Sequence, residues 1–131
     1  MPDARNRILI VDDEPDLLSV LHFGLEAAGF DVIEATDGEQ GLELARKKNP
    51  NLIVLDLMLP RVDGYKVCRT LKFDERYRKI PIFILSARSG EADRRLALEL
   101  GADAYITKPY DMKDLVGRIR ERLDPPATKA A

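Results

Sequence analysis

Short aliphatic runs alternate with segments of helical periodicity along the whole 131-residue chain, and this alternation restricts the possible folds most strongly. The runs RILIVD at 7–12 and NLIVLD at 51–56 are almost continuously apolar, as strands buried on both faces must be. Between such runs, apolar residues recur every three or four positions, which is the spacing of one face of a helix. Regular alternation of strands and helices predicts a parallel sheet with helices on both faces.

The pattern predicts five strands and five helices. We expect strands over residues 7–12, 30–35, 51–56, 80–86 and 103–107. We expect helices over residues 15–29, 37–49, 64–73, 91–101 and 112–123. In the first helix, the apolar face is predicted to consist of Leu17, Leu21, Leu25 and Ala28. Because crossovers between parallel strands are right-handed in nearly all proteins, the expected fold class is α/β with an open, doubly wound sheet.

The composition restricts the class of protein. A chain of 131 residues of which 45% are hydrophobic is expected to form one globular domain with a single core. A net charge of −2 gives no basic footprint, so direct binding to nucleic acid or to an anionic membrane is not expected. A single cysteine, no apolar leader and no run of about 20 apolar residues favour a cytoplasmic protein without a membrane span.

Polar side chains follow the expected strands at their carboxyl ends, which is the edge where open α/β sheets bind their ligands. In chain order, the candidate site residues at this edge are Asp12, Asp13, Glu14, Asp56, Ser86, Ala87 and Lys108. The first strand–helix turn has the sequence DDEPD rather than a glycine-rich phosphate loop, so a dinucleotide site is not expected.

Clustered carboxylates repel one another, and a bound divalent cation removes this repulsion. Oxygen ligands without histidine or cysteine favour Mg²⁺, Mn²⁺ or Ca²⁺ over zinc, and few protein ligands with open positions favour Mg²⁺. With the positive charge of Lys108 and the hydroxyl of Ser86, such a cation can hold the oxygens of a phosphoryl group. The carboxylate of Asp56 is then a candidate covalent acceptor that would form an aspartyl phosphate.

The motifs at this edge resemble those of the receiver domain of two-component response regulators. The matching segments are LIVDDE (9–14), VLDLMLPRVDG (54–64), ILSA (84–87) and GADAYITKP (101–109). The resemblance extends over residues 7–123 and implies a flavodoxin-like sheet with strand order 2-1-3-4-5. It also implies a receiver domain over residues 1–124, with residues 125–131 as a flexible tail or the start of a linker.

The resemblance implies a phosphoacceptor and a metal site at the ends of the first and third strands. Asp56 would accept the phosphoryl group. Asp13, and Asp12 mostly through water, would bind Mg²⁺ together with Asp56. The backbone carbonyl of Met58 would be a further ligand.

The resemblance also implies a phosphoryl-binding group and a switch at the ends of the last two strands. Lys108, joined to Pro109 by a cis peptide bond, would pair with the phosphoryl oxygens, together with Ser86 and Ala87. Ser86 and Tyr105 would form the switch pair. On phosphorylation Ser86 would donate to a phosphoryl oxygen and Tyr105 would turn inward, which changes the surface of the fourth helix, fifth strand and fifth helix.

The function implied is a phosphorylation-dependent switch and not a turnover enzyme. A sensor histidine kinase or a phosphotransfer protein would donate the phosphoryl group, and a downstream effector protein or output domain would respond. Two alternatives remain open: a pseudo-receiver that binds a partner without using phosphate, and a Mg²⁺-dependent phosphatase with an aspartyl nucleophile. The phosphatase is disfavoured because the acids are contiguous and no insertion could form a cap.

Two features depart from the receivers of winged-helix regulators. The segment at 72–81 is longer than in that type, and it resembles single-domain receivers and those attached to signalling enzymes. Ala104 stands where that type carries a second acid, which argues against the symmetric activation dimer of the family.

Overall fold

The computed structural model describes residues 5–123, in which five strands alternate with five helices. The strands are β1 (Arg7–Val11), β2 (Asp31–Ala35), β3 (Leu52–Leu55), β4 (Ile82–Ser86) and β5 (Ala104–Thr107). The helices are α1 (Pro15–Ala27), α2 (Gly38–Lys48), α3 (Gly64–Lys72), α4 (Glu91–Glu99) and α5 (Met112–Leu123). Every expected element is present, with ends shifted by at most two residues, and the expected tail at 125–131 lies outside the described residues.

The strands form one parallel sheet in the order β2-β1-β3-β4-β5, which confirms the predicted doubly wound α/β fold. Val11 of β1 pairs with Leu55 of β3, and Leu55 pairs with Ile84 of β4. Ser86, at the end of β4, pairs with Thr107 of β5. The residues that follow these strands therefore meet at one edge of the sheet.

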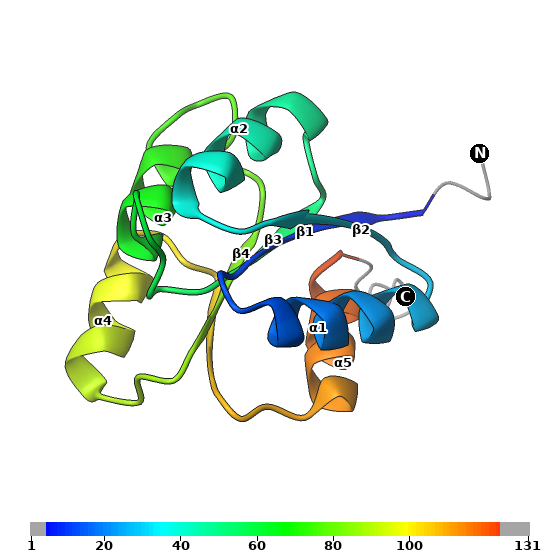
Figure 1. The fold of residues 1–131 in the computed structure, drawn as a ribbon. Coiled ribbons are helices and arrows are strands. Elements are labelled where there is room, and N and C mark those ends of the chain that lie inside the picture. Colours follow the sequence, from blue (N-terminus) through cyan, green and yellow to red (C-terminus); the bar gives the residue numbers. More distant parts are fainter. Residues whose placement is uncertain (1–4, 124–131) are drawn as a thin grey trace, which may run out of the picture.

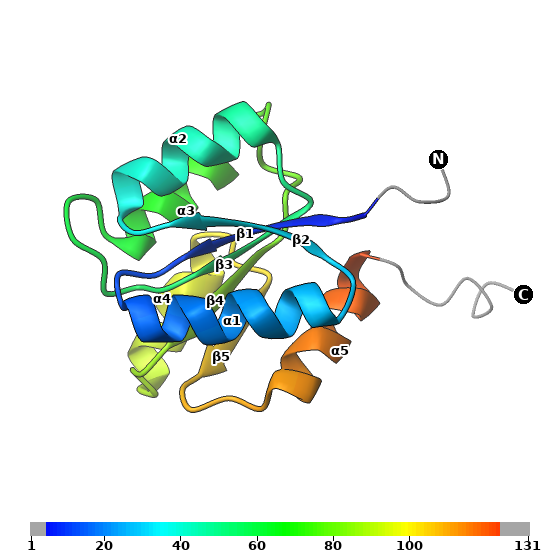
Figure 2. The same ribbon diagram turned by 45° about the vertical axis from the view of Figure 1, so that its right-hand side comes forward.

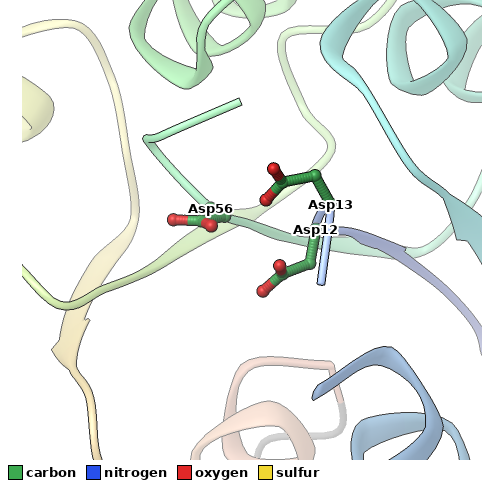
Figure 3. A group of neighbouring side chains, drawn as sticks. All are labelled: Asp12, Asp13 and Asp56. Atoms are coloured by element: carbon green, nitrogen blue, oxygen red, sulfur yellow. The ribbon is translucent and has the colours of Figure 1, made fainter. Parts of the chain in front are cut away.

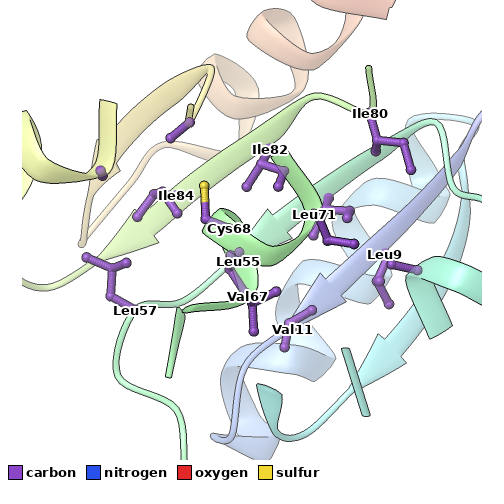
Figure 4. Close-up of a cluster of buried hydrophobic side chains, with 14 of the residues drawn as sticks. Leu9, Val11, Leu55, Leu57, Val67, Cys68, Leu71, Ile80, Ile82 and Ile84 are labelled. Atoms are coloured by element: carbon purple, nitrogen blue, oxygen red, sulfur yellow. The ribbon is translucent and has the colours of Figure 1, made fainter. Parts of the chain in front are cut away.

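Helices cover both faces of the sheet (Figures 1 and 2). Helices α1 and α5 pack on one face, where Leu21 and Ile119 belong to the same buried cluster as Ile10 of β1. Helices α2, α3 and α4 pack on the other face. Figure 4 shows Val67, Cys68 and Leu71 of α3 among the strand residues of this second cluster. Strands β1, β3 and β4 are buried on both faces because they lie in the middle of the sheet, which explains their unbroken aliphatic sequences.

The buried face of α1 differs from the prediction by one position. The structure buries Leu18, Leu21 and Leu25, whereas Leu17 is half-buried. A helical stripe can include either of two adjacent leucines, and the position of the helix on the sheet decides between them. Leu17 instead lines a hollow on the surface together with Val20 and Met112.

The long segment between α3 and β4 is held by one lysine. The Lys72 ammonium donates to the backbone carbonyls of Arg78 (3.0 Å) and Ile80 (2.8 Å), and it lies 2.8 Å from an Asp103 carboxylate oxygen. Asp103 in turn accepts the backbone N–H of Ile82 at 2.8 Å. These contacts hold the segment between α3 and β4 against the starts of β4 and β5.

In the described part of the chain, no helix combines the length and apolarity that crossing a membrane requires.

His22 joins α1 to β2 and gives the fold a mild pH dependence. Its ring nitrogens lie 2.7 Å from Glu34 and 3.2 Å from Glu26. Partial burial lowers the pKa of His22, but the hydrogen bonds to Glu34 and Glu26 outweigh it, and the net pKa is raised. The stabilisation is therefore complete below the unfolded-state pKa and disappears as the pH rises through the higher folded-state pKa.

Replacing His22 with glutamine is expected to lower the free energy of unfolding by about 0.5 kcal/mol near pH 6, the size of a largely exposed ion pair. Well above the folded-state pKa the imidazole is neutral, so wild type and variant should differ little. Urea unfolding at acidic and alkaline pH measures the difference. An equal loss of stability at both pH values would mean that the charge of His22 contributes nothing.

Candidate functional site

Three carboxylates meet at the carboxyl edge of the sheet. Asp12 and Asp13 follow β1, and Asp56 follows the neighbouring strand β3, so that one oxygen from each lies within 4.8 Å of the others (Figure 3). Asp12 and Asp56 are only 2% and 6% exposed, whereas Asp13 faces solvent. The structure therefore brings together the three acids that the sequence singled out.

This donor set fits a hard divalent cation. It consists of carboxylate oxygens only, and the exposed Asp13 leaves one side of the cluster open to water or a ligand. Mg²⁺ prefers such sites, because it keeps several waters and accepts phosphate oxygens. Glu14 is exposed, and its backbone N–H donates to Asp12 at 3.0 Å, so Glu14 orients Asp12 through its main chain.

The charge of Asp56 is unfavourable in this setting. Burial raises the pKa of Asp56, the Lys108 ammonium acts in the opposite direction, and Asp12 adds to the increase. The backbone N–H of Met58 donates to Asp56 at 3.2 Å. The net pKa of Asp56 is raised, so a cation bound at this position would relieve an existing electrostatic cost.

Lys108 supplies the positive charge nearest to these acids. Its ammonium lies 3.1 Å from Asp12, 3.6 Å from Asp56 and 4.0 Å from Glu14. Burial lowers the pKa of Lys108, but the hydrogen bond to Asp12 and the charge of Asp56 outweigh it, and the net pKa is raised. The side chain therefore remains a cation. The peptide bond between Lys108 and Pro109 is cis.

Ser86 and Tyr105 both contact the backbone of Arg88. Ser86 is fully buried, and its hydroxyl oxygen accepts the backbone N–H of Arg88 at 3.1 Å, so its hydroxyl proton remains available for another acceptor. The Tyr105 hydroxyl donates to the backbone carbonyl of Arg88 at 2.7 Å. Tyr105 is 4% exposed, so its ring points inward.

An apolar hollow of about 540 Å³ adjoins Lys108 and was not predicted from the sequence. Its lining residues are Leu17, Val20, Ala87, Lys108, Pro109, Tyr110 and Met112. Met112 also packs against Gly24 of α1, where a β-carbon would lie 2.8 Å from the Met112 sulfur. The signal in the sequence was the pair of adjacent leucines at 17 and 18, of which Leu18 enters the core and Leu17 lines the hollow.

Sequence reasoning also missed a polar contact between helices beside the site. The Tyr65 hydroxyl of α3 donates to Asp93 of α4 at 2.6 Å, and Asp93 also contacts the Arg88 guanidinium at 3.3 Å. No periodicity relates these residues, which lie on different elements. Met58 and Ala87 are exposed.

Similarity to known proteins agrees with this geometry. The family model of the response regulator receiver domain matches residues 8–120. The DNA-binding dual master transcriptional regulator RpaA of Synechocystis is 45% identical over 117 residues, which are 89% of this chain and 48% of that protein. The DNA-binding response regulator MtrA of Mycolicibacterium smegmatis is 45% identical over 123 residues, 94% of this chain and 53% of that protein. The chain thus spans about half the length of the curated relatives that it matches.

These relatives are named as DNA-binding regulators, although the longer segment at 72–81 resembled other receiver types. Among solved structures, a CheY-like response regulator receiver domain protein of Methanospirillum hungatei superposes with a TM-score of 0.87 at 29% identity. That match covers 98% of this chain and 100% of the other. With the receiver model matching nearly all of the described residues, the chain belongs to the family of response regulator receiver domains.

Proposed function

We propose that this receiver domain accepts a phosphoryl group on Asp56 and acts as a phosphorylation-dependent switch. The observation that carries the proposal is the position of Asp56: it is nearly buried, lies next to two further acids and has the Lys108 ammonium 3.6 Å away. A buried carboxylate that had only a structural role would destabilise the fold here, because its charge is close to two other acids. A phosphoacceptor, in contrast, needs both a neighbouring metal site and a fixed cation. The donor would be a phosphohistidine on a sensor histidine kinase or on a phosphotransfer protein.

The transfer forms one bond and breaks another. A carboxylate oxygen of Asp56 attacks the phosphorus, the P–N bond to the donor histidine breaks, and the imidazole leaves with the electron pair. Lys108, held beside Asp12 and Asp56, balances the charge of the phosphoryl oxygens throughout. Hydrolysis would end the signal: water attacks the phosphorus, the P–O bond to Asp56 breaks, the carboxylate of Asp56 is regenerated, and inorganic phosphate leaves while one proton is released to solvent.

Asp12, Asp13, Asp56 and the backbone carbonyl of Met58 would hold Mg²⁺, and Mn²⁺ has the same preference for oxygen ligands. The ion, when bound, supplies positive charge that neutralises the phosphoryl oxygens. Asp13 is exposed, so an ion bound to it would remain accessible to water. The buried Asp12 would also keep its contact with the Lys108 ammonium. The two adjacent acids therefore have different tasks in the proposed site.

The phosphoryl group would be sensed at the ends of β4 and β5. Ser86 retains a free hydroxyl proton, which can be donated to a phosphoryl oxygen, and the backbone N–H of Ala87 provides a second donor. Movement of Ser86 would be passed to Arg88 and from there to Tyr105, because both side chains bind the backbone of Arg88. The surface of α4, β5 and α5 would change as a result.

The receiver would occupy residues 1–124, with residues 125–131 as a tail or the start of a linker. Its partners would be the phosphodonor and a downstream effector protein or an output domain. The relatives named as DNA-binding regulators are about twice as long as this chain. The receiver itself, with a net charge of −2, is not expected to contact nucleic acid.

Acetyl phosphate tests the proposal without a partner protein. Wild-type protein incubated with acetyl phosphate and Mg²⁺ should gain the mass of one phosphoryl group, and excess EDTA should prevent the gain. Absence of an adduct in Mg²⁺ would favour the pseudo-receiver. Repeated turnover of ordinary phosphomonoesters would favour the phosphatase instead.

A further inference from the structure

The loop between β3 and α3 contains a strained residue at Arg61. Its φ is 68°, in the left-handed region that residues with a β-carbon seldom adopt. Such a conformation persists only where neighbouring contacts fix it. The same loop begins directly after Asp56 and contains Met58, whose backbone carbonyl is part of the proposed metal site. The contacts that fix Arg61 therefore act on the loop that supplies this carbonyl.

The β3–α3 loop lies beside the start of α2 (Figure 2), which supplies the partners of the Arg61 side chain. The Arg61 guanidinium lies 3.0 Å from a carboxylate oxygen of Glu39 and 3.7 Å from one of Asp37. Asp37 is the N-cap of α2, and Glu39 lies in the first turn of the helix. The other carboxylate oxygen of Asp37 accepts the backbone N–H of Gln40 at 2.8 Å. The helix thus fixes one of the acids that hold Arg61.

The backbones of the loop and of α2 also approach each other closely. The N–H of Gly38 lies 3.5 Å from the carbonyl oxygen of Pro60. A β-carbon at Gly38 would overlap the carbonyl oxygen of Val62 and lie 2.6 Å from its carbonyl carbon. Because only glycine leaves room for the loop here, the start of α2 is shaped to receive it. The half-buried Val62 side chain packs against the hydrophobic core on this face of the sheet.

The remainder of the loop is held by main-chain hydrogen bonds. The carbonyl oxygen of Leu57 accepts the N–H of Gly64 at 3.0 Å and that of Leu59 at 3.1 Å. Between them, the N–H of Met58 donates to the Asp56 carboxylate at 3.2 Å. The first part of the loop is therefore attached to α3 and to the phosphoacceptor, whereas its contact with α2 relies mainly on side-chain ion pairs.

We propose that Arg61 is a positioning residue for the metal site: its ion pairs with the start of α2 keep the Met58 carbonyl where metal binding requires it. The inference rests on the proposed function, since it concerns the same site. Arg61 is not itself a metal ligand, because a guanidinium is positively charged and accepts no bond. It acts through the backbone of the loop, which it joins to α2 three residues after Met58.

A purely electrostatic role for Arg61 makes the opposite prediction. Arg61 is a cation in the loop that follows Asp56, so through its charge alone it would repel a divalent cation. Removing that charge would then tighten metal binding, and removing the charge of Glu39 would weaken it. If Arg61 positions the loop, both removals weaken metal binding, because each breaks the same ion pair. The sign of the effect at Arg61 therefore separates the two roles.

The experiment titrates the full chain with Mn²⁺, which shares the oxygen-ligand preference of Mg²⁺ and loses its free-ion electron paramagnetic resonance signal on binding. Wild type is compared with Arg61→Ala, Glu39→Gln and the double variant. Arg61→Ala and Glu39→Gln should each weaken Mn²⁺ binding by about two- to fivefold, the effect of one exposed ion pair. The double variant should bind no more weakly than Arg61→Ala, because both changes break one contact.

Three further variants make the result specific. Asp13→Asn should lose the Mn²⁺ binding that is counted, which identifies the site. Glu43→Gln is the matched control, since Glu43 is an exposed acid of α2 that pairs with Lys47 at 3.0 Å; it should bind Mn²⁺ like wild type. Arg61→Gly adopts a positive φ without strain but has no guanidinium. It should lose less stability than Arg61→Ala and weaken Mn²⁺ binding as much.

The outcomes distinguish this inference from the proposed function. Wild-type or tighter Mn²⁺ binding in Arg61→Ala and Arg61→Gly overturns the inference alone, provided that wild type binds Mn²⁺ and forms the adduct with acetyl phosphate. Equal weakening in Glu39→Gln and Glu43→Gln also overturns it, since charge would then explain both. No Mn²⁺ binding by wild type overturns the proposed function and the inference together. Thermal unfolding checks each fold, and Arg61→Gly gives the result if Arg61→Ala does not fold.

Discussion

Replacing Asp56 with asparagine is expected to abolish phosphoryl uptake completely while making the metal-free protein slightly more stable. The amide of asparagine has nearly the shape of the carboxylate but cannot attack phosphorus. Burial raises the pKa of Asp56 and outweighs the opposite effect of Lys108, and Asp12 adds to the increase. The neutral amide therefore removes an unfavourable buried charge. The midpoint of thermal unfolding should rise by a few degrees, corresponding to a change of about 1 kcal/mol.

Intact mass after treatment with acetyl phosphate and Mg²⁺ measures the first effect, and calorimetry in EDTA measures the second. Asp16→Asn is the matched control, since Asp16 is an exposed acid in the first turn of α1. It should take up one phosphoryl group like wild type. A full adduct on Asp56→Asn would place the acceptor on another residue. A marked loss of stability would show that the Asp56 charge is favourably paired.

Replacing Gly64 with alanine is expected to destabilise the fold by about 2–3 kcal/mol, because an added methyl group has no space. A β-carbon at Gly64 would overlap the carbonyl oxygen of Asp56 and lie 2.6 Å from the α-carbon of Leu57. Both are backbone atoms, which cannot turn aside as a side chain can. The first turn of α3 therefore packs directly against the backbone of Asp56, the proposed phosphoacceptor, so that in the variant Asp56 should be displaced from Asp12 and Lys108.

Urea unfolding and the rate of phosphoryl uptake should both report this displacement. Gly117→Ala is the control, because Gly117 lies in α5 with open space around its α-carbon. There alanine should stabilise the helix by about 0.5–1 kcal/mol and leave uptake unchanged. If Gly64→Ala kept the stability and uptake rate of wild type, α3 would not be required to position Asp56.

The fold could be predicted from the sequence because strand apolarity, helix-capping residues and strand order all indicate the same architecture. Strand β3 is apolar at every position, since it lies at the centre of the sheet with helices on both faces. Asp37 and Asp63 cap α2 and α3 by accepting backbone N–H groups, so their helix starts are readable from the residue type alone. The juxtaposition of Asp12 and Asp56 also follows, because strands β1 and β3 are neighbours.

Contacts between separate helices could not be predicted in the same way. Tyr65 and Asp93 are 28 residues apart, and each has an ordinary local explanation: a tyrosine at the start of an amphipathic helix and an acid in a first helical turn. The choice between Leu17 and Leu18 depends on how α1 rests on the sheet. The inward ring of Tyr105 depends on a backbone carbonyl of the loop after β4. These three contacts depend on how the elements pack against one another, which the local periodicity of the sequence does not determine.

Ser86 and Tyr105 bind the main chain of Arg88 and not its side chain. The N–H of Arg88 donates to Ser86 and its carbonyl accepts from Tyr105, and any amino acid except proline provides both groups. The backbone connection between the ends of β4 and β5 should therefore survive the replacement of Arg88 by any residue other than proline, so the identity of this side chain is free to change without breaking that connection.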